Sequence, residues 1–141
     1  MSLNEESNNR AYVLGRLFAT FEQAQLDSSK PHPKAKPTIN TTIKNIYFNS
    51  ACATPRYVFC QLVKLNHAHL AKMRKSEEFY GLCRHYQKLI GKLMDKLKVE
   101  DDPFPAQQSI NDQLIFILGY YHQVQSPFTA KNKQQDSKEE A

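Results

Sequence analysis

The stretch LIFILGYYHQVQ, residues 114–125, decides how this chain is read, because an apolar run leads directly into two tyrosines, a histidine and two glutamines. Tyr120, Tyr121 and His122 fit either a small catalytic cluster or the polar end of a buried helix. Helical spacing predicts one packed face: Leu114, Ile117, Leu118 and Tyr121. Gly119 lets a neighbouring helix approach, and Tyr120 and His122 then hydrogen-bond at the flanks of that face. We therefore interpret the stretch as a packing helix.

Four more helices are predicted before this one, from apolar residues that recur about every 3.6 positions. Capping residues and a first-turn proline mark the expected starts: Asn8 or Asn9, Thr54 with Pro55, Ser76, and Ser109 for the last helix. The first helix should end near residues 25–27. The second should run over about residues 39–50 and bury one face: Ile39, Ile43, Ile46 and Tyr47.

These patterns predict an all-α fold, a helical bundle of about five helices. No stretch alternates between apolar and polar residues with a period of two, so strands are not expected. Residues 27–40 contain three prolines and three lysines and form a Pro/Lys-rich linker after the first helix. We expect residues 1–128 to form a single helical-bundle domain and residues 129–141 a disordered polar tail.

The overall composition excludes several classes of protein. The chain has 141 residues, of which 40% are hydrophobic, which suffices for one core without metal or disulfide support. The longest apolar run is far shorter than a membrane span, and the acidic, polar start is unlike a signal peptide. Three cysteines without a CxxC spacing read as reduced side chains. We therefore expect a cytoplasmic protein that does not engage a membrane.

Nothing in the sequence assembles a catalytic, metal or cofactor site. His67 and His69 are two residues apart, which places them on different sides of a helix. We therefore do not expect them to bind one metal ion together. Each of the four glycines stands alone inside a helix, so they do not form a phosphate-binding loop, and close helix packing is the expected reason for them. We predict no catalytic residues, no metal ligands and no cofactor.

The positive charge is concentrated in residues 39–98, which hold eleven Lys or Arg against three Asp or Glu. Four basic residues recur at four-residue steps and should form a row along one helix: Arg84, Lys88, Lys92 and Lys96. Each step rises about 6 Å, close to the spacing of phosphates on a stretched single strand. Basic residues on the preceding helix border the same groove if the two helices are antiparallel: Arg56, Lys64, Lys72 and Lys75. Weaker candidates, for RNA or a neighbouring subunit, are Arg10 and Arg16.

Two interpretations of these basic residues remain beside plain solubility. A polyanion gains most from clustered Lys and Arg, because its counterions are released. The alternative is a helical protein–protein interaction module that docks on acidic surfaces. Most aromatic residues between positions 47 and 86 sit at apolar-face positions and are expected in the core, so backbone contact without sequence specificity is the favoured mode.

Several stretches, in order, resemble a known family: NRAYVLGRLFATFEQAQ (9–25), TTIKNIYFNSACATP (41–55), HAHLAKM (67–73), YQKLIGKLMDKL (86–97) and FPAQQSINDQLIFILGYYHQ (104–123). They are similar to the C-terminal helical region of the large subunit of type I-C CRISPR surveillance complexes, called Cascade. The blocks LGRLFA and LGYYHQ are the most specific. The likeness covers residues 9–128.

This resemblance implies the function of a non-catalytic small subunit, which type I-C systems make by an internal translation start within the large-subunit gene. A full large subunit has a long N-terminal part, and this chain starts just ahead of the first helix. The expected partners are the guide RNA, the target and non-target DNA strands, the large subunit, the backbone subunits and other copies of the chain. Within the surveillance complex, the chain would stabilise the R-loop and the displaced non-target strand in antiviral defence.

Overall fold

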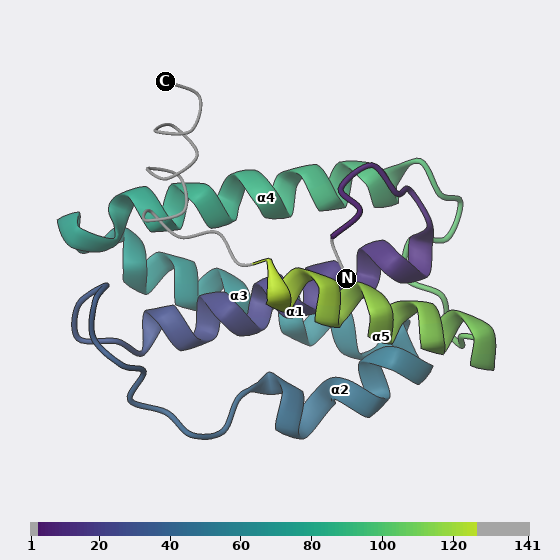
Figure 1. The fold of residues 1–141 in the computed structure, drawn as a ribbon, viewed down its shortest axis with the longest axis horizontal. Coiled ribbons are helices and arrows are strands. Elements are labelled where there is room, and N and C mark those ends of the chain that lie inside the picture. The colour runs from purple at the N-terminus through teal and green to yellow at the C-terminus, as the bar shows by residue number, and fades with distance from the viewer. Residues whose placement is uncertain (1–2, 127–141) are drawn as a thin grey trace.

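The computed structural model describes residues 3–126, and this part of the chain is helical with no strands (Figure 1). Five α-helices and one 3-10 turn follow in order: α1 (Arg10–Ser28), α2 (Ile43–Ala53), α3 (Pro55–Arg74), η1 (Glu77–Phe79), α4 (Tyr80–Lys98) and α5 (Ile110–Gln125). The all-α prediction is confirmed. The tail predicted for residues 129–141 lies outside the described residues.

Side-chain caps start α1 and α5 as predicted, whereas the predicted caps Thr54 and Ser76 make no capping hydrogen bond through their side chains. The side chain of Asn9 accepts a hydrogen bond from the backbone N–H of Tyr12, at 3.2 Å, and so starts α1. The hydroxyl of Ser109 accepts from the N–H of Asp112, at 3.1 Å, and starts α5. Helix α2 begins at Ile43, later than expected, because Thr42 and Asn45 form a reciprocal capping box there. Short-range chemistry therefore explains these boundaries.

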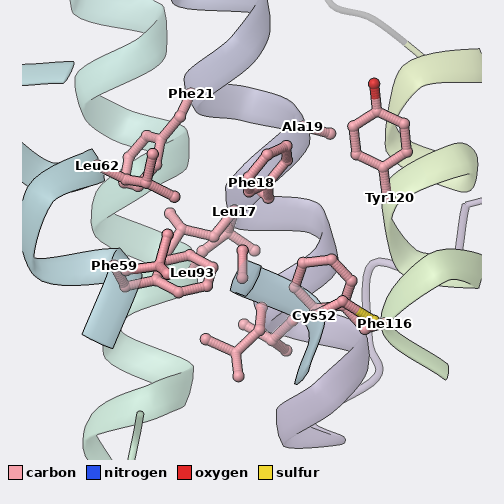
Figure 2. Close-up of a cluster of buried hydrophobic side chains, with 14 of the residues drawn as sticks. Leu17, Phe18, Ala19, Phe21, Cys52, Phe59, Leu62, Leu93, Phe116 and Tyr120 are labelled. Atoms are coloured by element: carbon pink, nitrogen blue, oxygen red, sulfur yellow. The ribbon is translucent and has the colours of Figure 1, made fainter. Parts of the chain in front are cut away.

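Helix α1 is the central helix of the bundle. All of its residues from 11 to 22 are buried, and it packs against each of the other four α-helices. Figure 2 shows α1 between two groups of core side chains, with Leu62 and Leu93 on one side and Phe116 and Tyr120 on the other. A helix covered on all sides needs small and apolar residues around its whole circumference, which the sequence YVLGRLFATF supplies.

The most extensive helix contact in the core is between α1 and α5, and two glycines let their backbones approach closely. A Cβ atom placed on Gly119 would overlap the carbonyl group of Tyr12, with 3.0 Å to its carbon. A Cβ placed on Gly15 would overlap the carbonyl oxygen of Phe116 and lie 2.8 Å from the backbone nitrogen of Tyr120. The predicted packing role of Gly119 is confirmed, and Gly15 has the reciprocal role.

The other two glycines contradict the predicted packing role. Among the described residues, no atom lies within 4 Å of a Cβ placed on Gly81 or Gly91. Both residues are exposed on α4. Glycine in a helix interior costs about 1 kcal/mol relative to alanine, and here helix packing does not explain that cost.

The packed face of α5 differs from the predicted one. The exposed side chains include Leu114, Leu118 and Tyr121, with 56%, 44% and 43% of their surface accessible. The buried face carries Phe116, Gly119, Tyr120 and Gln123. Helix α5 is apolar on both sides, so periodicity did not distinguish them. The fit of Gly119 against α1 and the polar partners of Tyr120 and Gln123 select the observed face.

A similar error affects α2 and its predicted apolar face. Ile43 is buried, but Ile46 has 66% of its surface accessible. Tyr47 lies partly buried against the core as predicted, and Phe48, which was not predicted there, lies beside it. Ile39 lies before the helix and is half-buried. The fully buried residues of α2 are at its two ends, at Ile43 and at Ala51 and Cys52.

The loop between α1 and α2 is tied at its base. The hydroxyl of Thr38 donates to the carbonyl of Ser29 at 2.7 Å, and the N–H of Thr38 donates to the Ser29 hydroxyl at 3.1 Å. At the end of α1, the carboxylate of Asp27 pairs with Lys30 at 2.7 Å and accepts from the Tyr86 hydroxyl at 2.5 Å. These bonds attach the loop to α1, and α1 to α4.

Candidate nucleic-acid interface

The polar residues of the 114–125 stretch connect α5 to α1 and α2 through hydrogen bonds. Tyr120 donates its hydroxyl hydrogen to the buried carboxylate of Glu22, which also accepts from the Thr42 hydroxyl at 2.5 Å. The Tyr12 hydroxyl and the Nδ1 atom of His122 share a hydrogen bond of 2.7 Å. Burial, followed by the bond to Glu22, raises the pKa of Tyr120. Its hydroxyl is therefore protonated at neutral pH and acts as a donor.

Residues 3–126 bring no three His, Cys, Asp or Glu side chains close enough to bind a metal ion together. The three cysteines are free thiols, with Cys52 and Cys83 buried and Cys60 exposed. None of the helices in the same part of the chain is long and apolar enough to cross a membrane.

Helix α4 carries the predicted basic row on its outer face. Its inner face packs into the core through Cys83, Tyr86, Leu93 and Leu97. On the opposite side Arg84, Lys88 and Lys92 are all exposed. Within residues 3–126, none of these three cations has a carboxylate at ion-pairing distance, since the basic partners of the described ion pairs are Lys30, Arg56 and Lys98. We call Arg84, Lys88 and Lys92 the α4 row.

Lys96, the fourth residue of the predicted row, is already engaged. Its ammonium donates to the carbonyl of Ser7 at 3.1 Å and to the side-chain oxygen of Asn8 at 3.0 Å. The side chain is half-buried, at the edge where the segment before α1 crosses α4. In this structure, three of the four predicted positions therefore present free charges.

The basic residues of α3 are exposed, but they do not all border α4. Helices α3 and α4 lie side by side in opposite directions, which is the condition under which a shared groove was expected (Figure 1). Gln61 of α3 accepts from the Tyr47 hydroxyl of α2 at 3.3 Å. Lys72 follows Gln61 by eleven residues, about three full turns, so it projects on the same flank of α3 as Gln61, toward the other end of the helix. Lys64 and Lys75 are also eleven residues apart and share the exposed side of α3.

Arg56 and Arg10 both contact the loop before α5. The guanidinium of Arg56 pairs with the Asp102 carboxylate at 2.8 Å and donates to the carbonyl of Phe104 at 3.2 Å. The guanidinium of Arg10 donates to the carbonyl of Asp102 at 2.8 Å. Both therefore have intramolecular partners, and Arg56 keeps half of its side chain accessible.

Arg16 corrects the sequence-based assignment, because it is an interior residue. Only 3% of its surface is accessible, and its Nε atom donates to the side-chain oxygen of Gln123 at 2.9 Å. Burial lowers the pKa of its guanidinium, an effect that the nearby Glu5 carboxylate opposes. Arg16 therefore joins α1 to α5 and is not available as a surface contact in this fold.

We expect replacement of Arg16 by alanine to lower the free energy of unfolding by about 2 kcal/mol, because a buried hydrogen bond from a charged group is lost. Arg16→Lys keeps the charge but not the planar Nε–H donor, so it should also destabilise. Chemical denaturation followed by circular dichroism measures both changes. A stable Arg16→Ala variant with a reduced salt dependence of nucleic-acid binding would instead support the surface role.

A comparison with protein-family models found that the CRISPR-associated protein (Cas_Csd1) family matches residues 1–128. The chain belongs to the Cas_Csd1 family. It is thus a CRISPR-associated protein of the Cascade type, and the resemblance seen in the sequence is confirmed at this level. A comparison with individual curated proteins found no match. In this Cas_Csd1 chain the two most specific blocks, LGRLFA and LGYYHQ, contain Gly15 and Gly119 and pack against each other.

Two exposed aromatic residues of the Cas_Csd1 chain were expected in the core. Tyr57 and Tyr80 have 69% and 50% of their surface accessible. Tyr80 lies four residues before Arg84, so it continues the α4 row by one step, and the Arg84 guanidinium is 6.0 Å from its ring centre. Residues four apart share one face of a helix, so the spacing from Arg84 was the sequence feature that indicated an exposed Tyr80.

Proposed function

We propose that this chain is a non-catalytic small subunit of a type I-C CRISPR surveillance complex, which binds nucleic-acid backbone without sequence specificity. In this proposal it stabilises the R-loop, chiefly the displaced non-target strand. The α4 row carries the proposal, because three exposed cations lie along one helix without carboxylate partners among the described residues. Family membership supplies the CRISPR context.

The physical argument favours a polyanion over solubility as the reason for the row. Like charges four residues apart on a helix destabilise it slightly, and Arg84, Lys88 and Lys92 repeat that arrangement twice. A strand of phosphates offsets this repulsion and releases counterions, which makes binding favourable and dependent on salt. Because exchange of the DNA duplex for an RNA–DNA duplex is nearly balanced, modest backbone contacts are enough to favour the R-loop.

The proposed partners are the guide RNA, the target and non-target DNA strands, the large subunit, the backbone subunits and other copies of this chain, all in the cytoplasm. The contact residues proposed on α4 are Arg84, Lys88 and Lys92, with Lys96 available only where the segment before α1 releases it. On α3 we propose Lys64 and Lys75 as a second line, with Lys72 on its other flank and Arg56 at its base. Arg10 stays a weaker candidate for RNA or a neighbouring subunit.

The double replacement Lys88→Ala and Lys92→Ala tests the proposal. Binding of single-stranded DNA should weaken, and the slope of log affinity against log salt should decrease by about 1.4, since each phosphate contact on a single strand contributes about 0.7. Filter binding over a range of salt concentrations measures both quantities. Both lysines are exposed, so circular dichroism should show unchanged helicity.

A matched control removes the same charge elsewhere. Lys36 lies in the loop after α1, and Lys98 already pairs with Asp95 at 3.5 Å. The double replacement Lys36→Ala and Lys98→Ala should leave the salt slope nearly unchanged. Equal slopes for the wild-type chain and the Lys88/Lys92 variant would contradict the proposal, and would favour docking on an acidic protein surface.

A further inference from the structure

The outer face of α4 carries an aromatic ring in line with its free cations. Tyr80, Arg84, Lys88 and Lys92 follow one another at four-residue steps, and all four are exposed. The Tyr80 ring is half accessible, and the guanidinium of Arg84 lies 6.0 Å from its centre. A tyrosine whose exposed ring contacts an arginine gives a flat platform beside the first charge of the row.

The two glycines of α4 lie beside the same row. Gly81 directly follows Tyr80, and Gly91 directly precedes Lys92. A Cβ at either position would meet open space in the described part of the chain, so neighbouring helices do not require these glycines. Glycine is a less favourable helix former than alanine at both positions. Glycine is favoured where a ligand approaches the backbone closely. At these two positions no side chain projects from α4, so the backbone is accessible on either side of the cations.

We propose that the outer face of α4 binds a single strand with an unpaired base stacked on Tyr80, while its phosphates follow Arg84, Lys88 and Lys92. Gly81 and Gly91 give the sugar–phosphate chain room to lie against the helix. This inference rests on the proposed function and narrows it to single-stranded nucleic acid. Tyr80 is a binding residue for any base, because every base presents an aromatic face.

The same surface fits a duplex less well. In a duplex the faces of the bases are covered by their neighbours, so the Tyr80 ring has nothing to stack on. An acidic protein surface would satisfy the cations, but it gives no reason for an exposed tyrosine at the head of the row or for two glycines that weaken the helix. The combination of ring, charges and open backbone therefore selects a single strand.

Replacement of Tyr80 tests the inference with two probes of equal length: oligo(dT), and an oligonucleotide with abasic sites throughout. Tyr80→Leu should weaken oligo(dT) binding about five-fold or more, the range measured for loss of one stacking contact. It should change binding of the abasic strand by less than about two-fold, because no base is present. Tyr80→Phe keeps the ring and should bind oligo(dT) nearly as the wild-type chain does.

The outcomes separate this inference from the proposed function. The salt slope should be unaffected by Tyr80→Leu, since no phosphate contact is lost, whereas Lys88→Ala with Lys92→Ala lowers it. If the lysine variants lower the slope but Tyr80→Leu binds oligo(dT) normally, the stacking site is overturned and the proposed function stands. Equal weakening of oligo(dT) and abasic binding by Tyr80→Leu would assign Tyr80 a structural role and also overturn the site.

A second variant tests the room beside the row. Gly91→Leu adds a good helix former in open space and should raise thermal stability. The added side chain occupies the surface where the strand lies, so oligo(dT) affinity should decrease several-fold. Unchanged or tighter binding by this more stable variant would show that the strand does not approach the helix at Gly91.

Discussion

Alanine at Gly15 or at Gly119 should destabilise the fold by on the order of 3 kcal/mol, the upper part of the range for overpacked cores. Each new methyl group would overlap backbone of the facing helix, at Phe116 for Gly15 and at Tyr12 for Gly119. Backbone inside a helix cannot rotate away as a flexible side chain can. Helices α1 and α5 would have to separate, which also weakens the buried bond between Arg16 and Gln123.

The same substitution at the other two glycines is the control. Gly91→Ala and Gly81→Ala place the methyl group in open space, so each should raise the free energy of unfolding by up to about 1 kcal/mol. Chemical denaturation followed by far-ultraviolet circular dichroism compares all four variants. Equal effects at all four positions would show that helix propensity dominates, and that α1 and α5 do not approach as closely as the structure shows.

The second large effect is expected at Phe116, whose side chain is fully buried. Its ring contacts those of Phe18 and Phe48 edge-on, with centroid distances of 6.1 and 5.8 Å. Phe116→Ala removes these contacts and leaves a cavity between α1 and α5 (Figure 2). The cost of such a change in a packed core is about 3 to 5 kcal/mol.

Leu114, two residues earlier on the same helix, is the matched control. More than half of its surface is accessible, at 56%, so Leu114→Ala should cost less than about 1 kcal/mol. Thermal and chemical denaturation of the two variants distinguishes the faces of α5. A larger loss at Leu114 than at Phe116 would restore the face that periodicity predicted and contradict the observed orientation of the helix.

The helices themselves could be predicted because their signals are local. Asn9 and Ser109 each satisfy a free N–H group within three residues, and Pro55 occupies a first-turn position. Such interactions depend on neighbouring residues, so the sequence is enough to locate them. The row Arg84, Lys88 and Lys92 is predictable for the same reason, since the period of one helix determines its direction.

The remaining features depend on contacts between distant segments. Helix α5 has apolar residues on both sides, and the fit of Gly119 against Tyr12, with the polar partners of Tyr120 and Gln123, selects the buried one. Arg16 is basic, and basic residues are usually exposed, yet Gln123, more than a hundred residues later, provides its partner in the core. Lys96 is likewise engaged by residues far away in the chain, Ser7 and Asn8.

The pairing of α1 with α5 has a consequence for the synthesis of the protein. Helix α1 is the first described helix to leave the ribosome, and α5, which covers one side of it, is the last. At about 5 to 20 residues per second, the apolar surface of α1 waits several seconds for residue 125 to appear. During that interval the nascent chain exposes apolar surface of the kind that chaperones bind. The exposure ends when α5 packs on α1, with Gly119 against the backbone of Tyr12.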